Sequence, residues 1–159
     1  MKKIFVLILV LLFCSCASKS NFSHSKAVFV SMKSAKLKFS EAGFVYNNDK
    51  IIKLELYKLA QPIITLDIYS SFICLNKICT SKKSFNKNIF GYQHYDDFIN
   101  DIFNSKPIYN GENIIKTNCG FTQNIKNHNY DINYEICHKN TMLKDQKNKT
   151  IFSIKGLNT

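Results

Sequence analysis

The sequence predicts an α+β fold in which a curved antiparallel sheet, a half-barrel built from a meander and a hairpin, is covered on one face by one or two helices. Three observations predict it. Runs in the middle of the chain alternate between apolar and polar residues, which is typical of strands with one buried face. Turn residues separate these runs at short intervals. The later stretch 91–107 instead repeats its apolar residues at helical spacing.

The start of the chain predicts export and lipidation. A positively charged start and an uninterrupted apolar run are followed by Ser15 and Cys16. This pattern is typical of a signal peptide over residues 1–15, and the run is too short for a spanning helix. A small residue before a cysteine resembles a bacterial lipoprotein signal, which implies an acylated Cys16 as the first mature residue. Processing at Cys14 and ordinary secretion after Ala17 are the alternatives.

Residues 16–34 are expected to be a lipidated N-terminus and a tether, because they are rich in Ser, Lys and Asn. The apolar segment 27–30 interrupts this composition, and its pattern does not distinguish a short helix from a short strand. A single folded domain is expected over residues 35–159, given the length of the chain. Several acyl chains on Cys16 would hold this domain firmly on a membrane.

The sheet is expected to begin with a strand over 36–46 that has a bulge or bend at Gly43. A meander of three strands follows after the turn at 47–49. Its first strand turns Ile52, Leu54 and Leu56 toward one face, and its last is expected over 78–80 after a turn at Asn76-Lys77. The middle strand is expected to share one face among Ile64, Leu66, Ile68, Phe72 and Cys74.

Leu59 is expected at the turn between the first two strands of the meander. It stands between Lys58 and Ala60, just before Pro62, which suits a strand start or an edge strand. An apolar side chain at such a turn gains little from the core.

After a loop at 81–89, the segment 91–107 predicts an amphipathic helix that covers the sheet. Its apolar stripe consists of Tyr95, Phe98, Ile99, Ile102 and Phe103. The runs 114–125 and 130–139 then predict a hairpin with its tip at 126–129, and 149–156 predicts a final strand.

Four cysteines remain after processing at Cys16, and an even number in an exported chain suggests disulfides. A turn at Asn76-Lys77 places Cys74 opposite Cys79, and a hairpin centred on His128 places Cys119 opposite Cys137. These two pairings are preferred among the three possible ones. A metal site that combines the cysteines with His138 is not expected, because the spacing lacks the short paired form of zinc sites. His24, His94 and His128 are expected at the surface or in turns.

The net charge of +11 comes from lysines, because the chain contains no arginine. Nucleic-acid binding is not expected, since it normally uses arginine and since the chain carries an export signal. Attraction to anionic lipid is a better use for the charge. No catalytic motif is found, so we expect no enzyme activity, and no cofactor is implied.

The order of these features resembles the outer-membrane lipoprotein receptor LolB, within the LolA/LolB-like family. The resemblance covers roughly residues 35–156 and is carried by a lipidated cysteine, a tether and four segments: EAGFVY, LELYKLAQPIITLDI, YDDFINDIFNSKPI and TIFSIKG. The chain departs from the family in being shorter, in lacking a strand and a helix after Pro107, and in having 58–62 in place of an Asn-Pro-Leu-Gly turn.

The resemblance implies a cavity for acyl chains and a role in localising lipoproteins to the outer membrane, on its periplasmic side. It implies membrane lipid, lipoprotein acyl chains and a periplasmic carrier as partners, and it makes Leu59 the candidate membrane-insertion residue, with a loop near 70–72 as the alternative. The candidate lining residues are Phe39, Leu54, Leu56, Leu66, Ile68, Phe98 and Ile102.

Three other classes remain open. A structural or protein-interaction envelope lipoprotein without a ligand cavity is the first. A hydrolase inhibitor is the second, although one directed at a basic lysozyme should be acidic rather than basic. An enzyme is the last.

Overall fold

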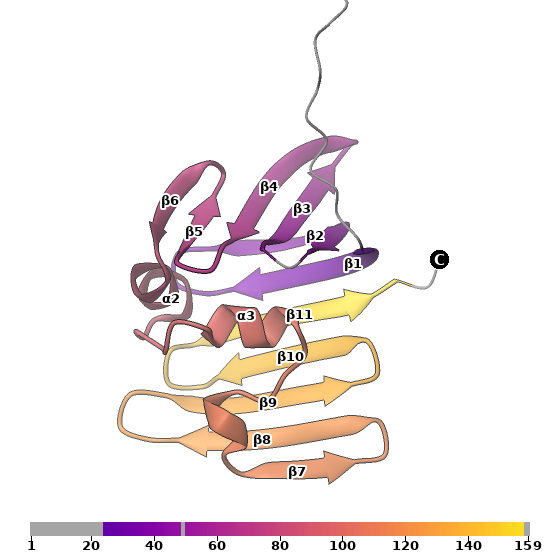
Figure 1. The fold of residues 1–159 in the computed structure, drawn as a ribbon. Coiled ribbons are helices and arrows are strands. Elements are labelled where there is room, and N and C mark those ends of the chain that lie inside the picture. Colours follow the sequence, from indigo (N-terminus) through magenta and orange to yellow (C-terminus); the bar gives the residue numbers. More distant parts are fainter. Residues whose placement is uncertain (1–23, 49, 158–159) are drawn as a thin grey trace, which may run out of the picture.

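The computed structural model describes residues 24–48 and 50–157, so the predicted signal peptide and Cys16 lie outside the described part. The described residues form a curved, unclosed antiparallel sheet with helices on one face, which confirms the predicted α+β class (Figure 1). Helices α2 (Lys82–Phe90) and α3 (Phe98–Phe103) and the short 3-10 helix η1 (Tyr109–Gly111) link its two halves. The strands are β1 (His24–Lys33), β2 (Lys38–Asn47), β3 (Ile52–Lys58), β4 (Gln61–Ile68), β5 (Phe72–Leu75), β6 (Ile78–Ser81), β7 (Ile114–Thr117), β8 (Gly120–Lys126), β9 (Asp131–Cys137), β10 (Asn140–Asp145) and β11 (Thr150–Gly156).

The described chain starts in the middle of this sheet and returns to it. It meanders outward from β1 to the edge strand β6, crosses one face through the helices, and meanders back from the opposite edge, β7, to β11. Strand β11 then pairs with β1, for example Ile154 with Val30 (Figure 1). The β1–β11 pair therefore joins two arms, β1–β6 and β7–β11, into one sheet.

The central strand β1 lies within residues 16–34, where a tether was expected. That prediction was wrong for residues 24–33, and the folded domain already includes His24 rather than starting at residue 35. Val28, Val30 and Met32 face the core, with intervening residues on the outer face. The apolar Phe29 among those intervening residues hides the alternation in the sequence, which is why the segment 27–30 could not be assigned.

The meander has four strands rather than three. The run expected as its middle strand breaks at 69–71 into β4 and β5, and the alternation changes phase there. Consequently Ile73 and Leu75 of β5 face the core, whereas Phe72 is exposed and Cys74 pairs with Asp67 on the outer face. The shared face expected for Phe72 and Cys74 was therefore wrong.

Gly43 is not a bulge but a point of close approach. A Cβ atom there would run into the backbone carbonyl of Glu55 on β3. Gly43 pairs with Leu56, and the register of the neighbouring β3–β4 pair shifts between Leu56 and Tyr57. The absence of a side chain thus lets β2 approach β3 beside an irregularity in the next pair.

The helical layer has two helices, one of which the sequence did not predict. Helix α2 occupies residues where a loop was expected: the Ser81 hydroxyl caps it by accepting a hydrogen bond from the Ser84 backbone N–H at 3.2 Å, and Gly91 ends it with φ 85°. The predicted helix over 91–107 is confined to α3, so Tyr95 lies before its first turn.

The second arm is also more finely divided than predicted. The run 114–125 contains two strands, β7 and β8, with a tight turn at Asn118-Cys119. Strand β10 was not predicted, because two of its three core-facing residues, Thr141 and Asp145, are polar. Asp145 is satisfied by three backbone N–H donors, those of Asp131, Lys147 and Asn148.

Candidate functional site

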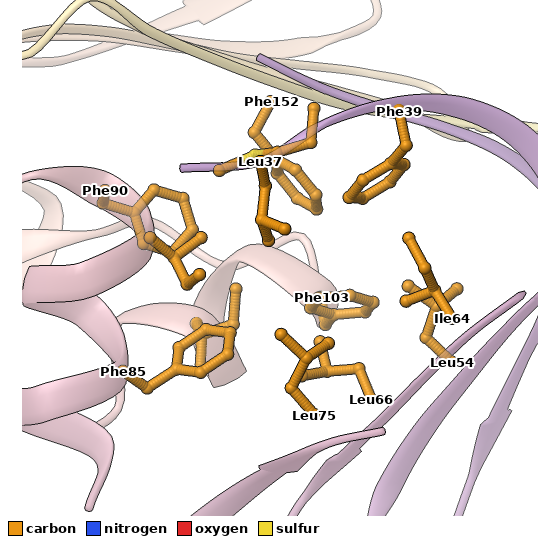
Figure 2. A pocket seen from close by; sticks show the side chains of 13 residues that line it. Leu37, Phe39, Leu54, Ile64, Leu66, Leu75, Phe85, Phe90, Phe103 and Phe152 are labelled. Carbon is orange, nitrogen blue, oxygen red and sulfur yellow. The ribbon is translucent and has the colours of Figure 1, made fainter. Parts of the chain in front are cut away.

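An apolar cavity lies between the helices and the first arm of the sheet. Figure 2 shows its lining side chains converging from β1–β5, β11, α2 and α3. Its volume is about 30 Å³, and it is partly open to solvent. No polar surface lines it. The lining residues are Met32, Leu37, Phe39, Leu54, Ile64, Leu66, Leu75, Phe85, Ile89, Phe90, Ile99, Phe103 and Phe152.

The hairpin between β1 and β2 places two of these side chains, Leu37 and Phe39. The Ser34 backbone N–H donates to the Leu37 carbonyl at 2.8 Å, and the Ser34 hydroxyl accepts from the Leu37 N–H at 3.1 Å. The Lys36 ammonium donates to Asn88 Oδ1 of α2 at 2.8 Å. The hairpin is therefore tied both to itself and to the helix on the other side of the cavity.

A buried lysine holds α2 against α3. Lys82 is only 3% exposed, and its ammonium lies 2.8 Å from the Asp97 carboxylate and 3.0 Å from Asn100 Oδ1. One turn further along α2, Asn86 Nδ2 donates to the Tyr95 carbonyl at 3.0 Å. These polar contacts lie outside the apolar lining, so the two helices are fixed without a polar group entering the cavity.

Three of the seven predicted lining residues contact the cavity: Phe39, Leu54 and Leu66. The other four, Leu56, Ile68, Phe98 and Ile102, are buried in the core that continues beyond it. The α2 side chains Phe85, Ile89 and Phe90 were missed. The sequence did contain an indication of this helix: Ser81 is a suitable N-cap, and Phe85, Ile89 and Phe90 follow at intervals that place them on one helical face.

The cavity as it stands is smaller than a ligand. Pockets for small molecules typically measure about 300–1,000 Å³, whereas the volume of this cavity is about 30 Å³. Its outer side chains are only half-buried, however: Leu37, Phe39, Ile64, Leu75 and Phe103. Their displacement would enlarge the cavity without uncovering a buried polar group.

Leu59 lies where the sequence placed it, at the tip of the β3–β4 hairpin, and its side chain is 93% exposed. It forms a two-residue turn with Ala60, in which φ is 50° at Leu59 and 61° at Ala60. Left-handed backbone of this kind suits Asn and Gly and disfavours leucine. The chain therefore presents an apolar side chain to solvent on a strained turn.

His94 is buried, contrary to the surface position that was expected. It is 2% exposed, stacks on Phe98 with ring centroids 4.0 Å apart, and its Nδ1 lies 2.6 Å from the Tyr109 hydroxyl. Burial lowers the pKa of His94 to about 4, against an opposing effect of Asp145. The same cluster includes Tyr130, which stacks on Tyr109. Aromatic packing and the contact with the Tyr109 hydroxyl explain why His94 is buried in the core beside the cavity.

A charged network lies on the opposite face of the sheet. Glu55 binds the Lys53 ammonium at 2.7 Å and accepts from the Tyr57 hydroxyl at 2.7 Å. The hydrogen bond to Glu55 raises the pKa of Tyr57 to about 12. Burial raises the pKa of Asp67, which faces Lys53 across the β3–β4 pair. Lys53, Glu55 and Tyr57 satisfy one another away from the cavity, whereas Asp67 Oδ1 is buried without a hydrogen-bond partner among the described residues.

Both predicted disulfides are present, Cys74–Cys79 and Cys119–Cys137. The first joins residues directly opposite in the β5–β6 pair. The register expected for the second was wrong by one residue, since Gly120 and not Cys119 faces Cys137, and the bridge is diagonal from the β7–β8 turn. Within the described residues, His138 and these two sulfurs lie within 4.8 Å of one another, but sulfurs joined in a disulfide are not thiolate ligands.

No protein-family model matches the chain, and a search of the curated proteins finds no match. Within the described residues, no helix is long and apolar enough to cross a membrane. The resemblance to the LolA/LolB-like family stays a prediction.

Proposed function

We propose that this chain is a membrane-anchored bacterial lipoprotein that binds acyl chains under α2 and α3 and helps to localise lipoproteins to the outer membrane. The observation that carries the proposal is the cavity, which has a wholly apolar lining and a mouth of half-buried side chains. Each methylene that enters such a space from water contributes about 0.8 kcal/mol. Transfer requires only this graded affinity, so the proposal includes no catalytic residue and no cofactor.

Binding of a chain requires the mouth to open. In the proposed mechanism Leu37 and Phe39 move away from Ile64 and Phe103, and the acyl chain takes their place against the sheet. The acyl chain would contact Leu54 and Leu66, whose side chains are already buried from solvent. The incoming methylenes replace the side-chain contacts that opening removes.

The exposed Leu59 supports the membrane step. A lipid anchor on Cys16 would keep the domain near the surface, and the β3–β4 tip would insert Leu59 into the apolar layer. Acyl chains of other lipoproteins are the proposed cargo, and a periplasmic carrier is the proposed donor. The net charge of +11 favours the approach to anionic lipid.

Uptake of a palmitate-length fluorescent fatty acid tests the proposal. The full chain should carry Cys16→Ser, so that no covalent acyl group contributes. Adjacent residues of β4 give a matched pair: Ile64 lines the cavity, whereas Ile63 is exposed and does not. Ile64→Asp should weaken uptake at least about tenfold, because a carboxylate at the mouth must be desolvated as the chain enters. Ile63→Asp should leave uptake unchanged, and circular dichroism should show both variants folded.

A second function, an envelope lipoprotein that acts through protein partners, has its own support. The cavity is small, and apolar side chains project elsewhere, notably Ile78, which is 77% exposed at the β5–β6 hairpin. Absence of uptake by the folded protein, together with equal behaviour of the Ile63 and Ile64 variants, would replace acyl binding by this function.

A further inference from the structure

A second hollow lies on the outer face of the sheet, over β1, β2 and the start of β11. It is an open depression with a volume of about 480 Å³, and it is lined by Ser31, Met32, Lys33, Lys38, Phe39, Ser40, Glu41 and Ile151. Met32 and Phe39 also line the apolar cavity. Because side chains alternate along a strand, their neighbours Lys33 and Lys38 point to the opposite, outer face. The two lysine side chains therefore lie on the face opposite the cavity, although the hollow and the cavity share Met32 and Phe39.

Two lysines line this hollow. Lys33 and Lys38 are directly opposite each other in the β1–β2 pair, and both are exposed. Like charges in this position repel each other and destabilise the pair. The ion pairs found among residues 24–48 and 50–157 all use other lysines. Among the described residues, therefore, neither Lys33 nor Lys38 is neutralised by an ion pair.

Serine hydroxyls form the floor. Ser31 and Ser40 are directly opposite each other, one step further along the same strands. The Ser31 hydroxyl lies 2.7 Å from that of Ser153 on β11, which is buried. The Ser40 hydroxyl is exposed and has no hydrogen-bond partner within the described residues. Small side chains here create the depression, and hydroxyls supply donors at its base.

The surroundings add positive charge. Ile151 faces Lys33 across β1–β11, and the next residue in that row is Lys144 on β10. Glu41 of β2 also lines the hollow, but it is directly opposite the core residue Val30, which directs its side chain toward the inner face. On the outer face the hollow is therefore lined by the ammonium groups of Lys33 and Lys38, the hydroxyls of Ser31 and Ser40, and the apolar side chain of Ile151.

We propose that this hollow binds a phosphate group, carried by an anionic lipid or free in solution. Lysine binds phosphate as a point charge, and serine hydroxyls donate hydrogen bonds to its oxygens. A bound phosphate would also remove the repulsion between Lys33 and Lys38. Lys33 and Lys38 lie on the face opposite the cavity, so their replacement leaves the apolar lining of the acyl site unchanged.

The test compares two doubly substituted chains in the Cys16→Ser background. One carries Lys33→Gln and Lys38→Gln in the hollow. The control carries Lys83→Gln on α2 and Lys116→Gln on β7, two exposed lysines outside it. Both lose the same charge, so a difference between them reports the site rather than the net charge.

Binding is measured with vesicles of phosphatidylglycerol in phosphatidylcholine, and separately by NMR titration with inorganic phosphate. A lysine near an anionic surface strengthens binding roughly fivefold, so the hollow variant should bind these vesicles at least about tenfold more weakly than the control variant. With a lipid source, this loss appears without saturable binding of free phosphate. With a free-phosphate source, the amides of Ser31 and Ser40 shift saturably and do so only when both lysines are present. Equal vesicle binding by the two variants, with no saturable shift in the parent chain, would overturn the proposal.

Discussion

Replacing Leu59-Ala60 by Asn-Gly is predicted to stabilise the fold while weakening its contact with membranes. The two residues form the β3–β4 turn with φ values of 50° and 61°. Left-handed backbone costs L-residues roughly 1–2 kcal/mol each, whereas Gly tolerates it freely and Asn nearly so. Leu59 is 93% exposed, so its removal sacrifices almost no packing.

The expected gain follows from these terms. Relief at two positions is worth about 2–4 kcal/mol, and the greater freedom of glycine in the unfolded chain takes back up to about 1 kcal/mol. A net gain of about 2 kcal/mol corresponds to roughly 4–8 °C in Tm for a domain of this size. The β5–β6 turn shows the alternative already in use, since Asn76 occupies the corresponding position with φ 48° and its Oδ1 accepts from the Thr65 N–H at 2.8 Å.

The assay combines urea unfolding with partition into phosphatidylglycerol vesicles, both on the Cys16→Ser chain. Burying a leucine side chain contributes about 2 kcal/mol, so loss of Leu59 should weaken partition roughly thirtyfold. Ile78→Ser, at the other exposed hairpin, serves as the control and should change partition little. A fall in stability of the Asn-Gly variant would refute the strain argument, and unchanged partition would refute the membrane role of Leu59.

Three further predictions concern the packing around the cavity. The pKa of His94 is about 4 in the folded chain and 6.5 in the unfolded one, so the folded state is fully stable above pH 6.5 and loses stability as the pH falls toward 4. Urea unfolding should show a fall of about 3 kcal/mol in the free energy of unfolding over this range, and His94→Gln should reduce this pH dependence. Asp97→Ala should destabilise the fold by about 1–3 kcal/mol, because it leaves the buried Lys82 ammonium with Asn100 as its one remaining partner. Lys82→Met should cost less, because it removes the buried charge itself. If chemical denaturation showed Lys82→Met to be the more destabilising change, the argument from an unpaired buried charge would be contradicted. Gly43→Ala should lower stability by at least about 2 kcal/mol, since its Cβ meets a backbone carbonyl of β3, and an unchanged Tm would show that the strands can separate freely.

Strand β3 could be predicted from the sequence because its core-facing residues are all aliphatic, whereas β1 and the break between β4 and β5 were not predicted. Ile52, Leu54 and Leu56 alternate strictly with polar residues, and the structure buries all three. Strand β10 fails this rule because Thr141 and Asp145 are buried by hydrogen bonding rather than by hydrophobicity. Alternation of apolar and polar residues in the sequence detects residues that are buried by hydrophobicity, and it misses polar residues that are buried by hydrogen bonding.

The cavity could be predicted only in part, because one wall belongs to an element whose sequence is mainly polar. Helix α2 contains Lys82 and Asn86 at buried positions, which disguise its apolar stripe. Their partners, Asp97 and the Tyr95 carbonyl, come from a different segment and depend on the tertiary fold. Burial of His94 likewise depends on Tyr109 and Tyr130, which lie far away in the sequence.

The acyl-binding proposal is tested most directly by lipid-exchange mass spectrometry on the full chain carrying Cys16→Ser, purified from cells. The account predicts a non-covalently bound acyl species that exchanges with added palmitate, persists in Ile63→Asp and is lost in Ile64→Asp. A folded parent chain that carries no acyl species and acquires none from excess palmitate would contradict it.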